Sequence, residues 1–410
     1  MERRLSDWIS GFLKYTENTE PPYTFRLWTA LHTVAAVLQR KCYLPWGSLT
    51  FYPNMYIVLV APPGAARKGT AMGPSLDLLS EPNLGIKLAA EAITREALIR
   101  ELKNANDTII NQQTGEMLLH SSLTIHSQEL TVFLGYHNYQ LMSDLADWYD
   151  CRKRWTYRTK WSGTDDIIGV WVNIIGATTP ELIQESLPMD AIGGGLTSRM
   201  VFVYEERRAK SVADPFLSKE ELELHDKLVI DLEMMKMLTG PFRVTDDFVD
   251  FWIKWYPEQE FYRPFDDPRF SGYFERRPTH VMKMAMLLNA SRGNNMTINK
   301  EDLTKAIGIL ELTEKKMFYT FKGVGKSRFA EVLTKIMAYV GRKKQVPYSE
   351  LINVFMRDVT KFDLDKIIET LEAMKFCKLM LPAGIITYND GYEGNYAQKM
   401  NIETTCTPEK

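Results

Sequence analysis

The chain has 410 residues, of which 45% are apolar and 25% charged, and this composition is typical of a globular protein with a large core. Its formal net charge of −2 excludes a general attraction to nucleic acid, so any such contact needs a local basic patch. The four cysteines are not paired at metal-binding spacing, which indicates reduced thiols and a cytoplasmic location. No stretch approaches the roughly 20 apolar residues of a membrane span, so no membrane contact is expected.

The first half of the chain alternates between helical and strand-like patterns. Residues 24–40 have apolar side chains at helical spacing, and residues 42–53 hold prolines and a glycine between short apolar runs, which predicts a helix and then a hairpin. The apolar run 55–60 predicts a buried strand, followed by a helix over 70–80. Thr94 is expected to cap another helix. Further short strands are predicted at 123–126, 170–175 and 200–204. This alternation indicates a parallel α/β sheet.

After about residue 215 the pattern becomes helical, with Asn299 and Asp302 spaced as a capping box. Residues 323–326 resemble a linker, and 328–389 predict three helices and a hairpin that turns at 382–384. We therefore expect an N-terminal helical segment and hairpin (1–50), an α/β core (51–215), a helical region (216–325), a small helix-and-hairpin domain (326–392) and a loose tail (393–410).

A candidate phosphate-binding loop follows the strand at 55–60. Such loops offer backbone N–H groups and a lysine to phosphate oxygens, with a hydroxyl for magnesium. Lys68 is the expected phosphate lysine and Thr70 the expected magnesium ligand, although Arg67 can replace either role. The predicted nucleotide contacts are Gly64, Ala65, Ala66, Arg67, Lys68, Gly69 and Thr70. The alternative is a plain turn with two surface basic residues, because the pattern departs from the usual G-x-x-x-x-G-K-[ST].

The other parts of a phosphate-transfer site are expected after neighbouring strands. Glu129 follows the strand at 123–126 and suits activation of water, with Ser127 in place of the missing magnesium aspartate. The alternative is that Glu129 caps the next helix. Thr178 follows the strand at 170–175 and can sense the γ-phosphate, although Thr-Thr-Pro at 178–180 is also a common helix start.

Arg199 follows the glycine run 193–195 and precedes an apolar strand. A flexible glycine run that carries one arginine suits an arginine finger, which stabilises charge on the phosphoryl group of a neighbouring subunit's nucleotide. The alternative is a surface arginine in a glycine loop.

The segment 151–161 is the densest basic and aromatic stretch and contains no acidic residue. Basic side chains contact phosphates and aromatic rings stack on bases, so this segment is the predicted DNA contact. The basic residues concerned are Arg152, Lys153, Arg154, Arg158 and Lys160. The alternative is a surface loop whose tryptophans pack on the sheet.

Together these elements resemble the AAA+ helicase-type proteins of phage and mobile-element replication modules, which are similar in layout to minichromosome-maintenance helicases. The segments that carry the resemblance are 53–56, 67–70, 127–130, 176–180 and 196–199, within a span of roughly 20–290. The resemblance implies a P-loop AAA+ core with a parallel sheet, a helical lid and a C-terminal winged-helix domain.

The resemblance also implies roles for individual residues. Lys68 would bind phosphate, Glu129 would be the Walker B glutamate, Thr178 the first sensor and Arg199 the finger, and a second sensor would fall at Arg276 or Arg277. A hairpin with its tip at 156–159 would line a central pore. The function implied is an ATP-dependent DNA helicase or translocase that uses ATP and Mg²⁺. It would act on single-stranded or forked DNA as a hexameric ring and meet other replication proteins through the winged helix. If phage-encoded, it would work in the host cytoplasm.

Two rival functions remain at this point. The altered loop and the missing aspartate favour a non-motor replication factor, such as a helicase loader or an origin-binding scaffold, that binds nucleotide with weak or no hydrolysis. A sequence-specific regulator is disfavoured by the predicted third helix of the C-terminal domain, 362–375, because its outer face is mainly acidic. Its buried face is expected to be Leu364, Ile367, Ile368, Leu371 and Met374.

Overall fold

The computed structural model of the chain describes residues 2–110, 115, 117–159, 163–187, 193–321, 330–380 and 383–389. The chain divides into two compact units, Met1–Val324 and Gly325–Lys410. The first unit contains a mixed α/β fold and the second a small α/β fold with its own core. None of the helices in this described part combines the length and the apolar character that crossing a bilayer requires.

The first unit is built on a five-stranded sheet with the order β4-β5-β8-β3-β9. These strands are β3 (Tyr56–Val60), β4 (Asn106–Ile110), β5 (Met117–Ser127), β8 (Val170–Thr178) and β9 (Met200–Tyr204). Only β4 runs antiparallel to its neighbour, and the other four strands are mutually parallel. The segment around Leu88 pairs in parallel with Thr124 of β5, past the residues of β5 that pair with β4. Every residue of β3 and β8 is buried, as expected for a parallel sheet covered on both faces.

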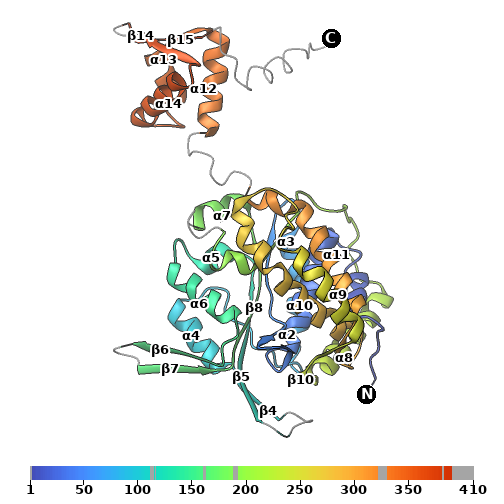
Figure 1. Cartoon of the computed structure of the whole chain (residues 1–410). Helices are drawn as coiled ribbons and strands as arrows, with labels where there is room; N and C mark the ends of the chain where they lie inside the picture. Colours follow the sequence, from blue (N-terminus) through green and yellow to red (C-terminus); the bar gives the residue numbers. More distant parts are fainter. Residues whose placement is uncertain are drawn as a thin grey trace. The chain divides into compact units, whose positions relative to one another are not determined.

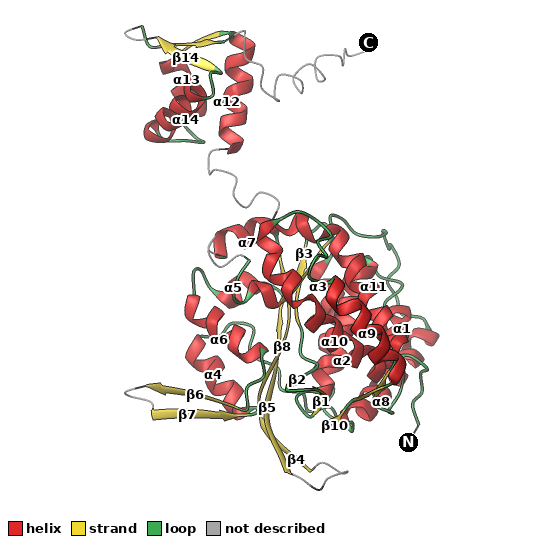
Figure 2. Ribbon diagram, in the orientation of Figure 1, coloured by secondary structure: helices red, strands yellow, loops and turns green. Residues whose placement is uncertain are grey.

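Helices cover both faces of this sheet (Figure 2). On one side lie α2 (Tyr23–Leu38) and α3 (Lys68–Leu79), and on the other side lie α4 (Arg95–Asn104), α5 (Leu130–Leu134), α6 (Tyr139–Tyr149) and α7 (Pro180–Ser186). The predicted cap is confirmed, because the Thr94 hydroxyl accepts a hydrogen bond from the Ala97 N–H at the start of α4. Such caps satisfy backbone donors that the helix itself leaves free.

A second group of helices packs beside α2 and joins the same core (Figure 1). These helices are α1 (Trp8–Tyr15), α8 (Lys219–Lys236), α9 (Asp246–Glu258), α10 (Ser271–Arg292) and α11 (Lys300–Met317), with short pairings by β1 (Cys42–Trp46), β2 (Leu49–Phe51), β10 (Gly240–Pro241), β11 (Arg243–Val244) and β12 (Thr297–Ile298). The capping box of Asn299 and Asp302 is present at the start of α11. One hydrophobic cluster extends from Trp8 to Phe321, so the regions expected at 1–50, 51–215 and 216–325 pack as one body.

Two β-hairpins project from this body (Figure 1). One is formed by β4 and the first half of β5, and the other by β6 (Arg154–Thr159) and β7 (Gly163–Ile168). The predicted hairpin tip at 156–159 is wrong, because these residues form strand β6 and pair with residues 163–166 of β7. The first hairpin was not predicted, since its outer strand is mostly polar and exposed.

The second unit contains α12 (Ala330–Lys343), β13 (Gln345–Pro347), α13 (Tyr348–Phe355), α14 (Lys361–Ala373), β14 (Cys377–Met380) and β15 (Ile385–Tyr388). The three predicted helices and the hairpin are confirmed, and β13 adds a third strand beside β15. Met374 lies after α14 and is 40% exposed, so its prediction as a buried residue is wrong. The predicted linker, 323–326, and the predicted tail, 393–410, both lie outside the described residues.

Candidate functional site

The carboxyl ends of β5, β8 and β3 meet at one edge of the sheet. Val60 at the end of β3 lies opposite Thr178 at the end of β8, and Ser127 at the end of β5 lies opposite Gly176. In open parallel sheets this edge is where ligands bind, because the loops that follow the strands form a crevice there. The loop 61–67, the segment 127–129 and the start of α7 all lie at this edge.

The loop 61–67 connects β3 directly to the N-terminus of α3. Gly64 and Arg67 adopt left-handed backbone conformations, with φ of 67° and 55°, and both are exposed. Arg67 occupies the N-cap position of α3, but no side chain caps this helix. Among the described residues, no side chain accepts a hydrogen bond from the first N–H groups of α3, and a helix N-terminus of this kind favours an anion.

Lys68 lies at the start of α3 and bends back over the loop. Its Nζ donates a hydrogen bond of 2.8 Å to the Ala61 carbonyl. Partial burial lowers the pKa of Lys68, while the charges of Glu129 and Glu181 oppose this shift. The neighbouring Arg67 instead points to Glu20, with 2.6 Å between Nε and Oε2. Lys68 is therefore the cation that faces the sheet edge, and Arg67 is held by another carboxylate.

Glu129 is exposed beside this loop. It stands at the N-cap position of α5, yet its side chain makes no capping hydrogen bond, so the alternative role as a cap is not observed. The preceding residue, Gln128, lies against Gly69 at the start of α3. A Cβ atom on Gly69 would come within 3.3 Å of the Gln128 Oε1, so a residue without a side chain permits this close approach. The start of α3 and the residue that follows β5 are therefore in direct contact.

The side chains whose hydroxyl groups are predicted site residues differ in their exposure to solvent. Thr70 is exposed in the first turn of α3, whereas Ser127 is buried, so Thr70 is the more accessible of the two predicted magnesium ligands. Thr178 is also buried, and its carbonyl accepts a hydrogen bond from the Ala61 N–H at the start of the loop. The Thr179 hydroxyl caps α7, with Pro180 at the first turn, so the alternative of a helix start is confirmed for Thr179.

A cavity of about 560 Å³ lies beside the loop and was not predicted from the sequence. It is lined by Pro22, Tyr23, the segment 204–209, Lys316 and Tyr319. Tyr204 and Tyr319 face each other with ring centroids 5.4 Å apart. The Arg208 N–H donates to the Ala65 carbonyl, so the wall of the cavity is hydrogen-bonded to the loop itself. The signal available in the sequence was the run of polar residues directly after β9.

Arg199 lies at the opposite end of the sheet from the loop. It ends a 3₁₀ turn, Thr197–Arg199, and directly precedes β9, which runs parallel to β3 with Met200 opposite Tyr56. At about 3.3 Å per strand residue, four residues separate the two ends of β9 by about 13 Å. Arg199 of one chain therefore does not face the loop of the same chain.

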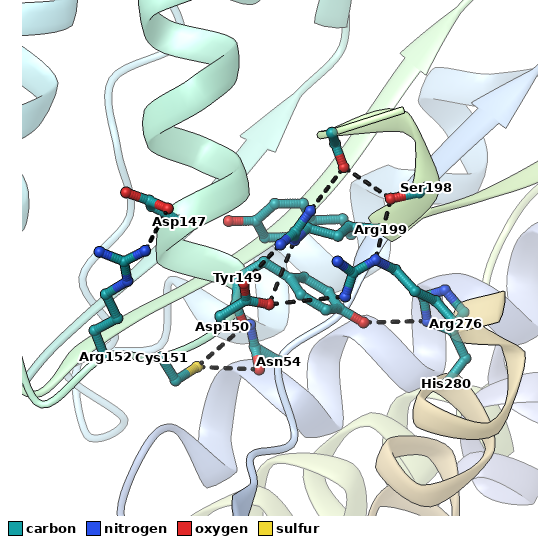
Figure 3. A network of polar contacts seen from close by, with 12 residues as sticks. Asn54, Asp147, Tyr149, Asp150, Cys151, Arg152, Ser198, Arg199, Arg276 and His280 are labelled. Atoms are coloured by element: carbon teal, nitrogen blue, oxygen red, sulfur yellow. Dashed lines mark hydrogen bonds and ion pairs between the residues drawn. The ribbon is translucent and has the colours of Figure 1, made fainter. Parts of the chain in front are cut away.

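Gly193, the first glycine of the run before Arg199, lies close to the backbone at the start of α10, whereas Gly194 and Gly195 are exposed. A Cβ atom on Gly272, at the start of α10, would come within 2.5 Å of the Gly193 carbonyl oxygen. The glycines thus allow two backbone segments to approach closely. Arg199 itself forms a 2.6 Å ion pair with Asp150, and its side chain is only 12% exposed (Figure 3).

The prediction of Arg277 as a phosphate contact is wrong. Its side chain is 1% exposed and forms a 2.7 Å ion pair with Glu314, with a further hydrogen bond to Gln259. A guanidinium that is buried and paired in this way is not accessible to a ligand. Its neighbour Arg276 lies beside Arg199 instead, with its Nε donating to the Ser198 hydroxyl at 3.1 Å.

The basic segment forms one strand of the β6–β7 hairpin and its approach. Arg154 and Arg158 lie on one exposed face of β6. Arg154 pairs with Asp166 of β7, and Arg152 pairs with Asp147 at 2.9 Å, so acidic residues elsewhere in the chain partly neutralise this segment. Lys153 is exposed, and Lys160 lies outside the described residues.

The aromatic side chains of this hairpin turn inward. Trp155 packs edge-on against Trp148 of α6, with ring centroids 5.4 Å apart, and its other face stacks with Tyr157. The Arg95 guanidinium lies 4.7 Å from the centre of the Tyr157 ring. Trp155 therefore packs on the body, but from a strand and against α6, whereas the alternative expected a surface loop packed on the sheet.

The structure thus brings Lys68, Thr70, Glu129 and Thr178 to one edge of the sheet, and places Arg199, Arg276 and the basic hairpin elsewhere. No protein-family model matches the chain, and no curated protein sequence matches it significantly.

Proposed function

We propose that this protein is an ATPase of the AAA+ type that acts on DNA, with the loop 61–67 as its phosphate-binding site. The observation that carries the proposal is the convergence of an uncapped helix N-terminus, Lys68 and an exposed Glu129 at the carboxyl edge of a parallel sheet. A triphosphate needs backbone donors and a cation, and the attacking water needs a carboxylate. All three are supplied by residues at this edge.

In the proposed site, the N–H groups at the start of α3 and the Lys68 ammonium bind phosphate oxygens. Magnesium, when bound, supplies further charge neutralisation, and the Thr70 hydroxyl is the side chain placed to hold it. Glu129 orients water and accepts its proton. The nucleoside lies in the cavity beside the loop, where Tyr204 and Tyr319 provide aromatic faces to the base. The buried Thr178 supports the loop through its backbone.

The position of Arg199 supports an assembly of copies with nucleotide at their interfaces. Because Arg199 lies at the other end of the sheet from its own loop, it can serve only the site of a neighbouring chain. A head-to-tail interface that repeats in this way closes into a ring when the rotation permits. Arg276 replaces Arg277 as the proposed second cation, because it lies beside Arg199.

DNA contact is proposed through Lys153, Arg154 and Arg158 at the β6–β7 hairpin, as phosphate binding without base stacking by Trp155. In the second unit, the order of three helices and three strands supports the winged-helix domain implied by the resemblance. Outside its buried face, α14 carries four carboxylates against two lysines: Asp363, Asp365, Glu369 and Glu372, with Lys361 and Lys366. An acidic helix favours contact with another protein of the replication machinery over reading of the major groove.

A single experiment tests the proposal and separates the motor from the non-motor factor. ATP binding and ATP turnover are measured with and without single-stranded DNA for the full chain, Lys68→Ala, Glu129→Gln and Arg67→Ala. We expect Lys68→Ala to lose binding, and Glu129→Gln to bind but turn over about 100-fold more slowly or worse. Arg67→Ala is the matched control for a basic side chain in the same loop.

Nucleotide binding by the unmodified chain without any turnover supports the non-motor replication factor. Binding that is unchanged in Lys68→Ala would overturn the proposed site itself.

A further inference from the structure

Asp150 lies between two parts of the molecule with different proposed roles. Arg199 would act at the ATP site of a neighbouring chain, and the β6–β7 hairpin would bind DNA. Its carboxylate accepts hydrogen bonds from Arg199 Nη2 at 2.6 Å and Arg199 Nε at 3.3 Å, which is a side-on, two-point contact (Figure 3). Arg276 Nη1 lies 4.0 Å from the same carboxylate. Two-point contacts fix the plane of a guanidinium as well as its position. Asp150 therefore sets the direction of Arg199.

In the part of the chain that the structure describes, this cluster holds two arginines and one carboxylate. Burial and then the positive charge of Arg199 lower the pKa of Arg276, so the two guanidinium groups repel each other. Arg199 also donates to the Gly195 carbonyl at 2.8 Å, and Arg276 donates to Ser198 in the same turn. These neutral acceptors fix geometry but add no negative charge. Among the described residues, Asp150 is the carboxylate that lies within 4.0 Å of both arginines, so its removal frees Arg199 to reorient.

The backbone on both sides of Asp150 is anchored to the body. Asn54 Nδ2 donates to the Tyr149 carbonyl at 3.0 Å, and the buried Cys151 thiol donates to Asn54 Oδ1. The buried Lys283 of α10 in turn donates to the Asn54 carbonyl at 3.1 Å. Cys151 has a left-handed φ of 52° at the point where α6 ends and the approach to the hairpin begins. Asp150 is thus held at a fixed corner between α6 and β6.

This corner is joined to the basic hairpin by both sequence and packing. The chain reaches β6 four residues after Asp150, and the Arg152 and Lys153 carbonyls accept hydrogen bonds from Val170 and Gly169 at the start of β8. Trp155 of β6 packs on Trp148 of α6, two residues before Asp150. A force on the hairpin therefore acts on the end of α6 that carries Asp150.

We infer that Asp150 is a positioning residue that couples the β6–β7 hairpin to Arg199, so that DNA on the hairpin changes turnover at the neighbouring chain's ATP site. The inference rests on the proposed function. It assigns no contact between Asp150 and the nucleotide. Asp150 acts through Arg199, and its effect is on the response to DNA.

The test compares Asp150→Asn with Asp147→Asn in the full chain. Asp147 lies one turn earlier on α6 and pairs with Arg152 near the surface. Asp147→Asn is therefore a matched control, because it also removes one carboxylate at this end of α6. ATP turnover is measured with and without single-stranded DNA, together with DNA affinity and the KM for ATP. For Asp150→Asn we expect the stimulation by DNA to fall at least tenfold, with DNA affinity and KM unchanged. Asp147→Asn should keep the stimulation.

The outcomes separate this inference from the proposed function. An unmodified chain with no ATP turnover contradicts the motor, whatever the Asp150 variants do. Full stimulation by DNA in Asp150→Asn overturns the inference while the motor stands. If Asp150→Asn loses its cooperative unfolding transition, Asp150→Glu keeps the charge and moves the carboxylate by one methylene. Loss of stimulation in a folded Asp150→Glu chain then supports the inference, and full stimulation contradicts it.

Discussion

The guanidinium of Arg277 and the carboxylate of Glu314 form a 2.7 Å ion pair in which each side chain is only 1% exposed. The pair joins α10 to α11, and Tyr273 also donates to Glu314 at 2.9 Å. Removing one partner from such a pair leaves a buried charge without compensation, which typically costs about 3–5 kcal/mol. The structural role of Arg277 is therefore to neutralise the buried carboxylate of Glu314.

Arg277→Met is therefore expected to lower the free energy of unfolding by about 3–5 kcal/mol, because Glu314 stays buried without its cation. Urea unfolding measures this change. Arg263→Ala is the control, since Arg263 pairs with Glu275 at the surface, and loss of an exposed pair costs about 1 kcal/mol or less. Equal losses in the two variants would contradict the structural role of Arg277.

Mixing two inactive variants tests whether Arg199 acts on a neighbouring chain. Lys68→Ala chains lack a working loop but keep Arg199, and Arg199→Ala chains keep the loop. An interface between an intact loop and an intact Arg199 forms at about a quarter of the positions in a random equal mixture. We expect each variant alone to have turnover reduced by about 10³-fold or more. Activity that fails to rise on mixing would show that Arg199 serves no neighbouring site.

The hairpin variants separate charge from packing. Arg158→Ala and Lys153→Ala should each weaken binding to single-stranded DNA and reduce its salt dependence by about 0.7 in the slope of log K against log salt. Trp155→Ala should instead cost about 2 kcal/mol of stability, because Trp155 packs on Trp148. Titrations at several salt concentrations and urea unfolding measure the two effects. A Trp155→Ala chain that keeps its stability but loses DNA binding would mean that the ring stacks on a base.

The tyrosine-lined cavity gives a prediction about affinity. Tyr319→Ala removes the ring that faces Tyr204, so the KM for ATP should rise about tenfold or more while kcat stays unchanged. Tyr256→Ala is the matched control, because Tyr256 is 53% exposed on α9 and does not line this cavity. An unchanged KM in Tyr319→Ala would exclude this cavity as the nucleoside site.

Buried histidines predict the pH dependence of stability. Burial lowers the pKa of His120 to about 4 and that of His280 to about 3, from an ordinary value of 6.5. Below pH 6.5 the unfolded chain binds protons at these side chains, whereas the folded chain does not, so the free energy of unfolding falls as the pH falls. Each histidine contributes at most about 1.4 kcal/mol per pH unit.

Urea unfolding between pH 7 and 5 measures this slope. His120→Asn should reduce it, because the proton uptake of the unfolded chain at this position is lost. A slope that is the same with and without His120 would contradict the assignment. The window stops at about pH 5 because carboxylates begin to titrate below it.

The local sequence pattern was sufficient to predict several elements of this protein. The apolar run 55–60, the cap at Thr94, the capping box of Asn299 and Asp302, and the helices and hairpin of the second unit all depend on residues close together in sequence. The spacing of apolar residues and the capping side chains act over one or two turns of the chain. These features can therefore be predicted from short stretches of sequence. The order of Lys68, Glu129 and Thr178 along the chain was also available, because each lies at or after the end of a strand.

Tertiary structure decided which of these residues meet and which are already engaged. Only the parallel register of β3, β8 and β9 places Arg199 at the end of the sheet away from the loop. Ion pairs over long sequence distances hold Arg67 at Glu20 and Arg277 at Glu314. The availability of a charged side chain depends on partners that the fold brings from elsewhere, and no local pattern contains that information. The sequence determined the elements and the candidate residues, and the fold determined which of them remain free to act.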